Sequence, residues 1–114
     1  MADLLPELGC YLLAGGALTS APLPAEVRDA EALGLGAAFI SERYNVKEAA
    51  TLSGAAGAAS TAIGLATAAT NHNSRHPLVT ASFATTMHRL TGGRFALGLG
   101  RGIAPLQAAY GLPP

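Results

Sequence analysis

Four apolar segments recur along the chain, and each of the first three is followed by a stretch with helical periodicity. The segments begin near residues 8, 37, 62 and 95, an average spacing of about 29 residues. They are apolar throughout rather than alternating, which is typical of strands in a parallel sheet with covered faces. Strands that alternate with helices in this way predict an α/β fold. Eight such units would need about 230 residues, close to the size of a (β/α)8 barrel. The four units in these 114 residues therefore predict half of a TIM-type barrel with parallel strands.

The expected elements follow from periodicity and from breaker residues. We expect strands at 8–15, 37–41, 62–69 and 95–100, and helices at 25–33, 46–60 and 77–90. Pro24 and Pro77 stand at helix starts, where a missing N–H is tolerated. Residues 70–76 are expected to form a polar loop, and residues 103–114 a loop or an incomplete helix. The whole of 1–114 is expected to be one truncated barrel domain.

Composition excludes several classes of protein. Charged residues make up 12% of the chain, about half the usual share in soluble domains, which excludes a disordered chain. Seven basic residues balance seven acidic ones, so charge favours neither a nucleic-acid partner nor an anionic membrane. The single cysteine, Cys10, excludes an internal disulfide and is compatible with a reducing cytoplasm. Asp3 and Glu7 stand where an export signal would be basic, so we expect a cytoplasmic protein.

A membrane span and a metal site are also not expected. Residues 49–71 carry no charge and are long enough to cross a bilayer. Their only large aliphatic side chains are Leu52, Ile63 and Leu65, so a helix followed by a buried strand explains the run better. The three histidines have no carboxylate or thiolate at ligand spacing, so we predict no metal site.

Four motifs then follow in a fixed order. Ser41-Glu42-Arg43 ends the second strand, and residues 63–71 (IGLATAATN) span the third. Residues 75–79 (RHPLV) open the third helix, and residues 90–100 (LTGGRFALGLG) join that helix to the fourth strand. In this order the motifs resemble the N-terminal half of the luciferase-like monooxygenase superfamily, in particular its branch that uses the deazaflavin coenzyme F420. The resemblance covers residues from about 8 to 102.

The resemblance implies a ring-binding site at the carboxyl ends of the strands, as is general for such barrels. In this family the third strand carries a non-proline cis peptide in a bulge behind the ring. Alignment on Pro77 places that bond between Thr67 and Ala68. Their small side chains would let the backbone approach the ring, or would simply fit a crowded buried strand.

Further cofactor-binding positions are implied at Glu42, Thr70 and Gly100. Thr70 matches a position that hydrogen-bonds the cofactor in some relatives, and the alternative is a hydroxyl that ends a strand. Glu42 matches an acidic residue that touches the cofactor, and the alternative is a carboxylate at the positive end of a helix dipole. Gly100 belongs to glycines that would clear space at the barrel mouth.

The chain also departs from some relatives. Arg43 stands where family members that oxidise sugar phosphates, and bacterial luciferase, have a histidine, and Ile103 stands where the former have a glutamate. Arginine cannot serve as a general base because it stays protonated, so no catalytic residue is assigned. Arg43 would instead bind an anionic substrate or the phosphates of the cofactor, or would be an exposed, solvated side chain.

The activity implied by the resemblance is hydride transfer between F420 and a small organic substrate, with the cofactor supplying the chemistry. We expect this chain to be a fragment that is inactive alone. Two alternatives remain open. One is an FMN-dependent monooxygenase, and the other is a non-catalytic half-barrel that forms a homodimer through its open sheet edges.

Overall fold

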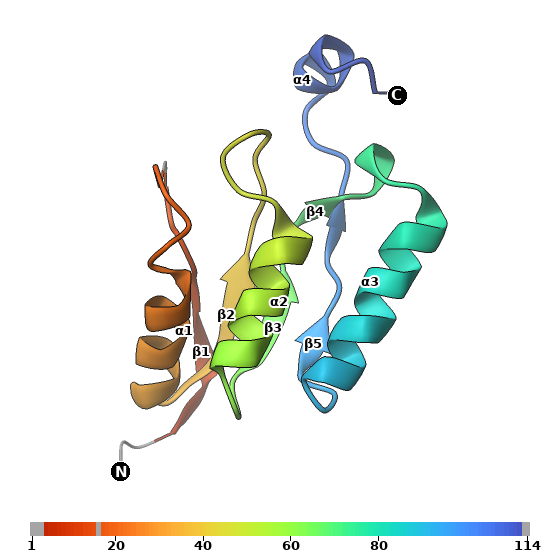
Figure 1. The fold of residues 1–114 in the computed structure, drawn as a ribbon. Coiled ribbons are helices and arrows are strands. Elements are labelled where there is room, and N and C mark those ends of the chain that lie inside the picture. The colour runs from red at the N-terminus through yellow and green to blue at the C-terminus, as the bar shows by residue number, and fades with distance from the viewer. Residues whose placement is uncertain (1–3, 16, 113–114) are drawn as a thin grey trace.

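The computed structural model describes residues 4–15 and 17–112, and its elements follow the expected order (Figure 1). Helix α3 begins and ends at the predicted residues, and α4 forms within the segment expected to be a loop or an incomplete helix. Pro113 and Pro114, the end of that segment, lie outside the described residues. The elements are β1 (Leu5–Tyr11), α1 (Leu23–Ala32), β2 (Leu35–Ile40), α2 (Ala49–Ala59), β3 (Gly64–Thr67), β4 (Thr70–Asn71), the 3-10 turn η1 (His72–Ser74), α3 (Pro77–Leu90), β5 (Phe95–Ala96), β6 (Leu99–Gly100) and α4 (Ala104–Ala109).

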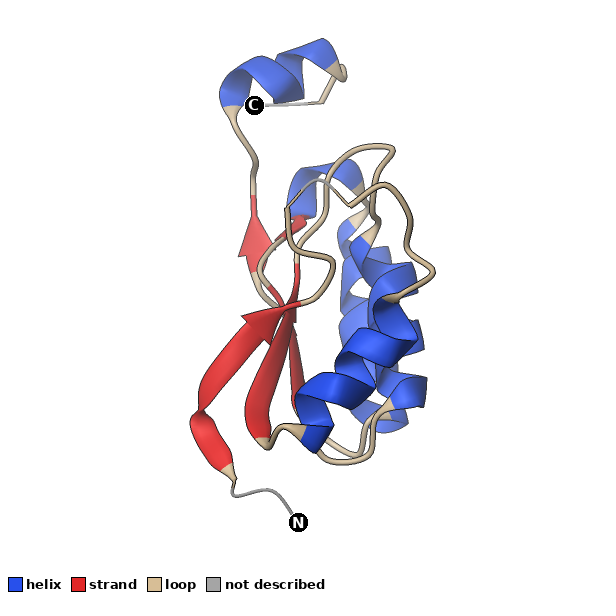
Figure 2. Cartoon of the chain, turned by 90° about the vertical axis from the view of Figure 1, so that its left-hand side faces the viewer, coloured by secondary structure: helices blue, strands red, loops and turns tan. Residues whose placement is uncertain are grey.

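The main sheet has the order β1-β2-β3-β5, and all its strand pairs are parallel. The strands of this sheet therefore lie side by side in their order along the chain, as in a barrel and unlike a doubly wound sheet. Strand β4, between β3 and β5 in the chain, pairs with β6 instead. Figure 2 shows α1, α2 and α3 on one side of the sheet. The sequence predicted strands covered on both faces, and this is wrong for the described residues. The uncovered face carries Tyr11, which is 53% exposed.

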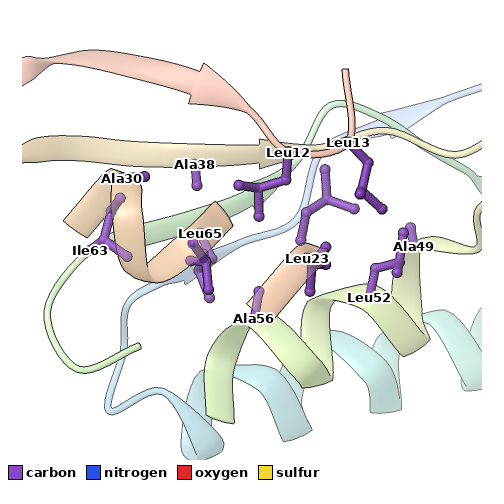
Figure 3. Packing of buried hydrophobic residues seen from close by; sticks show 12 residues of the cluster. Leu12, Leu13, Leu23, Ala30, Ala38, Ala49, Leu52, Ala56, Ile63 and Leu65 are labelled. Carbon is purple, nitrogen blue, oxygen red and sulfur yellow. The ribbon is translucent and has the colours of Figure 1, made fainter. Parts of the chain in front are cut away.

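The hydrophobic core lies between the helices and this sheet (Figure 3). Leu23 and Val27 of α1 and Leu65 of β3 are almost fully buried in it. Helix α2 contributes small residues, and a side chain at Gly57 would lie 3.1 Å from Cγ2 of Thr91, at the end of α3. Small residues thus allow α2 to lie close to its neighbours. The uncharged run at 49–71 forms α2, β3 and β4, and in the described part of the chain no helix is long and apolar enough to cross a membrane.

A bulge separates β3 from β4 and divides the predicted fourth strand, 95–100, into β5 and β6. The segment 70–76, predicted to be a polar loop, begins with β4 and η1 because Thr70 and Asn71 pair with β6. Ala66 pairs with Ala96, and the next pair is Thr70 with Leu99. Three residues of one strand therefore lie opposite two of the other, which defines a β-bulge. The expectation of a bulge at the end of the third strand is confirmed.

The cis peptide bond joins Ala68 to Ala69, so its predicted place between Thr67 and Ala68 is wrong by one residue. Thr67 is still paired in register with Ile40, and the amide of Ala68 donates to the Ile40 carbonyl at 2.7 Å. Regular pairing with β2 therefore continues through the amide of Ala68, and the cis bond comes directly after it. Alignment on Pro77 could not show this because the register is set by the neighbouring strand.

Candidate functional site

The carboxyl ends of β2 and β3 meet at one edge of the sheet, where polar side chains converge. Glu42 follows β2, and its Oε1 accepts hydrogen bonds from the Thr70 hydroxyl at 3.0 Å and from the Asn71 amide at 2.6 Å. Asn71 pairs in turn with Gly100 of β6. The structure therefore brings together Glu42, Thr70 and Gly100, which the sequence predicted to lie at one mouth.

Glu42 also holds the start of the next helix. Its Oε2 accepts from the amide of Ala49, the first residue of α2, at 3.1 Å, and from Nη2 of Arg75 at 2.9 Å. The Glu42 side chain is 9% exposed. Of the two roles expected for this carboxylate, contact with a helix N-terminus is the one observed. Both carboxylate oxygens of Glu42 accept hydrogen bonds from protein donors. These bonds connect the end of β2 to the start of α2 and to β4.

Arg75 is the residue that sequence reasoning missed. Nη1 donates to the Thr70 hydroxyl at 2.6 Å, and Nη2 donates to Glu42 and, at 3.1 Å, to Glu48. The guanidinium side chain is 15% exposed. A signal was available, because Arg75 lies in the loop after the third strand and Glu42 lies just after the second. Carboxyl ends of neighbouring parallel strands share an edge, so opposite charges placed there can pair.

The ionisation of this cluster is fixed by its hydrogen bonds. Burial alone would raise the pKa of Glu42, but bonds from Arg75, Asn71, Ala49 and Thr70 outweigh burial and lower the pKa below its ordinary value. Burial alone would lower the pKa of Arg75, but Glu42 and Glu48 raise it. Both groups therefore stay charged at neutral pH. The pair is suited to holding the site in shape and unsuited to taking up a proton.

Thr67 and Gly98 fix the bulge below this cluster. Thr67 is 2% exposed, and its hydroxyl donates to the Gly98 carbonyl at 2.9 Å and accepts from the Gly98 amide at 2.8 Å. A side chain at Gly98 would overlap the carbonyl oxygen of Thr67. The Thr67 hydroxyl is therefore satisfied inside the protein, and the close approach of the two strands requires glycine at position 98.

The surface beside the bulge lacks large side chains. Ala68, Ala69, Gly98 and Gly100 are all partly exposed there. A Cβ atom added at Gly100 would lie 3.2 Å from the Cβ of Ala69. We call these four residues the small-residue surface. It presents backbone and methyl groups, with no bulky side chain among its members.

A cavity of about 730 Å³ lies at the N-terminus of α2. Asn71, the strand partner of Gly100, is among its lining residues. The rings of Tyr44 and Tyr110 form one side of it, with their centroids 4.8 Å apart. Its charged lining residues are Glu42, Arg43, Lys47, Glu48 and Arg75. Within residues 4–15 and 17–112, no group of three or more His, Cys, Asp or Glu side chains could hold a metal ion.

Comparison with known proteins identifies the family. The family model described as luciferase-like monooxygenase matches residues 5–114. The chain belongs to this family. A search of curated proteins gave no match.

Solved structures agree with this family assignment. The F420-dependent tetrahydromethanopterin reductase from Methanopyrus kandleri is 29% identical, with a TM-score of 0.80 over 93% of this chain and 30% of that one. The oxygenating constituent of 3,6-diketocamphane monooxygenase from Pseudomonas putida, in complex with FMN, is 23% identical, with a TM-score of 0.77 over 90% of this chain and 31% of that one. A monooxygenase from Streptomyces bottropensis is also 23% identical, with a TM-score of 0.73 over 92% and 36% of the two chains.

The luciferase-like chain spans about a third of the length of these solved structures. They are TIM barrels, so the prediction of about four βα units of a TIM-type barrel is confirmed. The family is described as luciferase-like monooxygenase, and the structure at 29% identity is a reductase.

Proposed function

We propose that this chain forms part of the cofactor site of an oxidoreductase that transfers hydride between the deazaflavin F420 and a small organic substrate. The observation that carries the proposal is the small-residue surface at the carboxyl ends of the strands. The 29% identity with an F420-dependent reductase, over 93% of this chain, supports a deazaflavin over FMN.

The residues present fit a flat ring. Ala68, Ala69 and Gly100 carry at most a methyl group, so a planar group would be able to lie against their backbone. A Cβ atom at Gly100 would crowd the Cβ of Ala69, at 3.2 Å. The polar groups behind this surface are already hydrogen-bonded to one another. Ala68 and Gly100 would therefore contact the ring.

Glu42, Thr67 and Thr70 would act as positioning residues in this site. Thr67 holds the bulge, and Glu42 with Thr70 holds the strand ends that lie behind the ring. When bound, a deazaflavin supplies the carbon that accepts or donates the hydride. The chain's own residues would orient the ring and keep water from its buried face.

The test is a titration of the 15N-labelled chain with F420 and, separately, with FMN, each up to millimolar concentration. We expect F420 to shift the amide resonances of Ala68, Ala69, Gly98 and Gly100 and to leave those of α1 unchanged. The variant Gly100→Val should lose these shifts, because its larger side chain fills the surface. Gly54→Ala, a change on α2 into open space, should keep them.

Two outcomes would count against the proposal. If FMN shifts these amides and F420 does not, the cofactor is a flavin, and the FMN-dependent alternative replaces the one proposed here. If neither compound shifts them while the spectrum shows a folded chain, the small-residue surface does not bind a ring.

A further inference from the structure

A tight turn after β2 places two cations side by side. The amide of Arg43 donates to the Lys47 carbonyl at 3.0 Å, and the amide of Lys47 donates to the Arg43 carbonyl at 3.1 Å. Asn45, with φ of 56°, makes the turn between them. Residues that pair directly in an antiparallel bridge project their side chains from the same face. Arg43 and Lys47 are therefore neighbours on one side of the turn.

Neither cation has a carboxylate partner among the residues that the structure describes. The ion pairs found there both belong to Arg75, which binds Glu42 and Glu48. Lys47 Nζ donates to the carbonyl of Leu13 at 2.9 Å. Like charges placed opposite each other across a strand pair are destabilising. A bound anion would remove this repulsion.

Both cations line the cavity described above. Three cations and two carboxylates line it, so their net charge is +1, and both carboxylates are engaged by Arg75 and by the start of α2. Arg43 and Lys47 are the cations of the cavity lining that are in no ion pair among the described residues. The Tyr44 and Tyr110 rings supply an aromatic wall, tilted by 36° to each other. The volume lies within the usual range for small-molecule sites.

We infer that this cavity binds a planar organic anion of the aromatic carboxylate class. The carboxylate would lie between Arg43 and Lys47, because arginine binds that group through two parallel hydrogen bonds. The aromatic body would lie against Tyr44 and Tyr110, which favour offset or edge contacts with a ring. Asn71 lines the cavity and is the strand partner of Gly100. On the proposed function, this would connect the bound anion to the small-residue surface through β4 and β6.

The experiment uses three probes and no flavin, so its outcome is independent of the deazaflavin proposal. The 15N-labelled chain is titrated with benzoate, with the neutral amide benzamide and with inorganic phosphate. We expect benzoate to shift the amides of residues 43–47 and Tyr110, and to bind about tenfold or more tightly than benzamide, because a hydrogen bond to a charged group contributes more than a neutral one. Phosphate should bind more weakly than benzoate because it has no ring.

Variants then separate the charge from the ring wall. Arg43→Gln and Lys47→Gln should each weaken benzoate binding about tenfold. Arg28→Gln, which removes an exposed cation on α1, is the matched control and should leave binding unchanged. Tyr110→Leu should weaken benzoate binding and leave phosphate binding unchanged.

Several results would overturn the inference. Equal binding of benzamide and benzoate would show that the cations do not hold the ligand. Phosphate binding without benzoate binding would show a simple phosphate site in which the tyrosines take no part. No binding of any probe, or equal weakening by the Arg28→Gln control, would show that the cavity has no specific anion site.

Discussion

The hydroxyl of Thr70 donates to Glu42 Oε1 at 3.0 Å and accepts from Arg75 Nη1 at 2.6 Å. Thr70 is fully buried, whereas Glu42 and Arg75 also line the cavity, so these hydrogen bonds connect the cavity lining to the interior. Glu42, at the end of β2, and Thr70, at the start of β4, are thus connected through hydrogen bonds between protein side chains. The shape of the candidate site therefore depends on this polar cluster.

Replacing Glu42 by alanine should lower the free energy of unfolding by about 2 kcal/mol. The change removes the acceptor of the Ala49 and Asn71 amides and of the Thr70 hydroxyl, and it removes one of the two ion pairs of Arg75. Glu42→Gln keeps one acceptor oxygen and should cost about 1 kcal/mol. Urea denaturation at pH 7 measures both. Losses below about 0.5 kcal/mol for both variants would show that the cluster is not stabilising.

Arg75→Met should destabilise the chain most at neutral pH. Arg75 lowers the pKa of Glu42 in the folded state, so its stabilising effect is present above the unfolded pKa of about 4.3. That effect is lost as the pH falls through the lower folded pKa. The difference in stability between the natural chain and the variant should therefore shrink between pH 6 and pH 3. A difference that grows on acidification would contradict the assigned pairing.

Glu31 makes a second test of acid stability, at the opposite end of the sheet. Its carboxylate accepts hydrogen bonds from the amides of Thr61, Ala62 and Ile63, at 2.6 to 2.9 Å for Oε2. Burial alone would raise the pKa of Glu31, but these amides lower it. Glu31→Gln should cost about 1 kcal/mol at pH 7. This cost should shrink between pH 7 and pH 3, as the pH falls toward the lowered folded pKa of the natural carboxylate.

The exposed neighbour Asp29, on the same helix, offers the matched control for Glu31. Asp29→Asn should leave the stability and its pH dependence nearly unchanged. Thermal unfolding of the three proteins across this pH range measures both effects. A parallel response of the two variants would show that the three amides do not depend on Glu31.

Two glycine-to-alanine changes should have opposite signs. Gly98→Ala places a methyl group on the carbonyl oxygen of Thr67 and should cost about 2 kcal/mol. Gly54→Ala, on α2, meets no atom within 4 Å and should stabilise the chain by about 0.5–1 kcal/mol through helix propensity. Thermal unfolding measures both. A neutral Gly98→Ala would show that the bulge can relax around a side chain.

Local signals predicted much of the fold. Helix α3 was located at both ends because Pro77 begins it and Gly92 and Gly93, with φ of 61° and 89°, follow its end. Helix α2 begins at Ala49 rather than the predicted residue 46. The turn at 43–47 uses those residues in a backbone pairing that helical periodicity does not reveal.

Contacts between distant segments could not be predicted in this way. The bulge depends on Thr67 and Gly98, which lie 31 residues apart and meet only after the strands pair. The sequence placed Glu42 and Thr70 at one mouth. The position of Arg75 after the third strand indicated an ion pair there, but not that its guanidinium would also bind the Thr70 hydroxyl. The homodimer and the small-molecule substrate stay predictions.

Two hydrogen bonds between Thr67 and Gly98 hold β3 and the segment after β5 together near the carboxyl ends of the strands. They fix the relative position of the two strands before the chain leaves the sheet for the loops that follow β4 and β6. Segments that do not carry Arg75, such as residues 101–103, can therefore change in length and sequence while the strands keep their offset. New ligand preferences can arise in those segments without any adjustment of the framework that supports them.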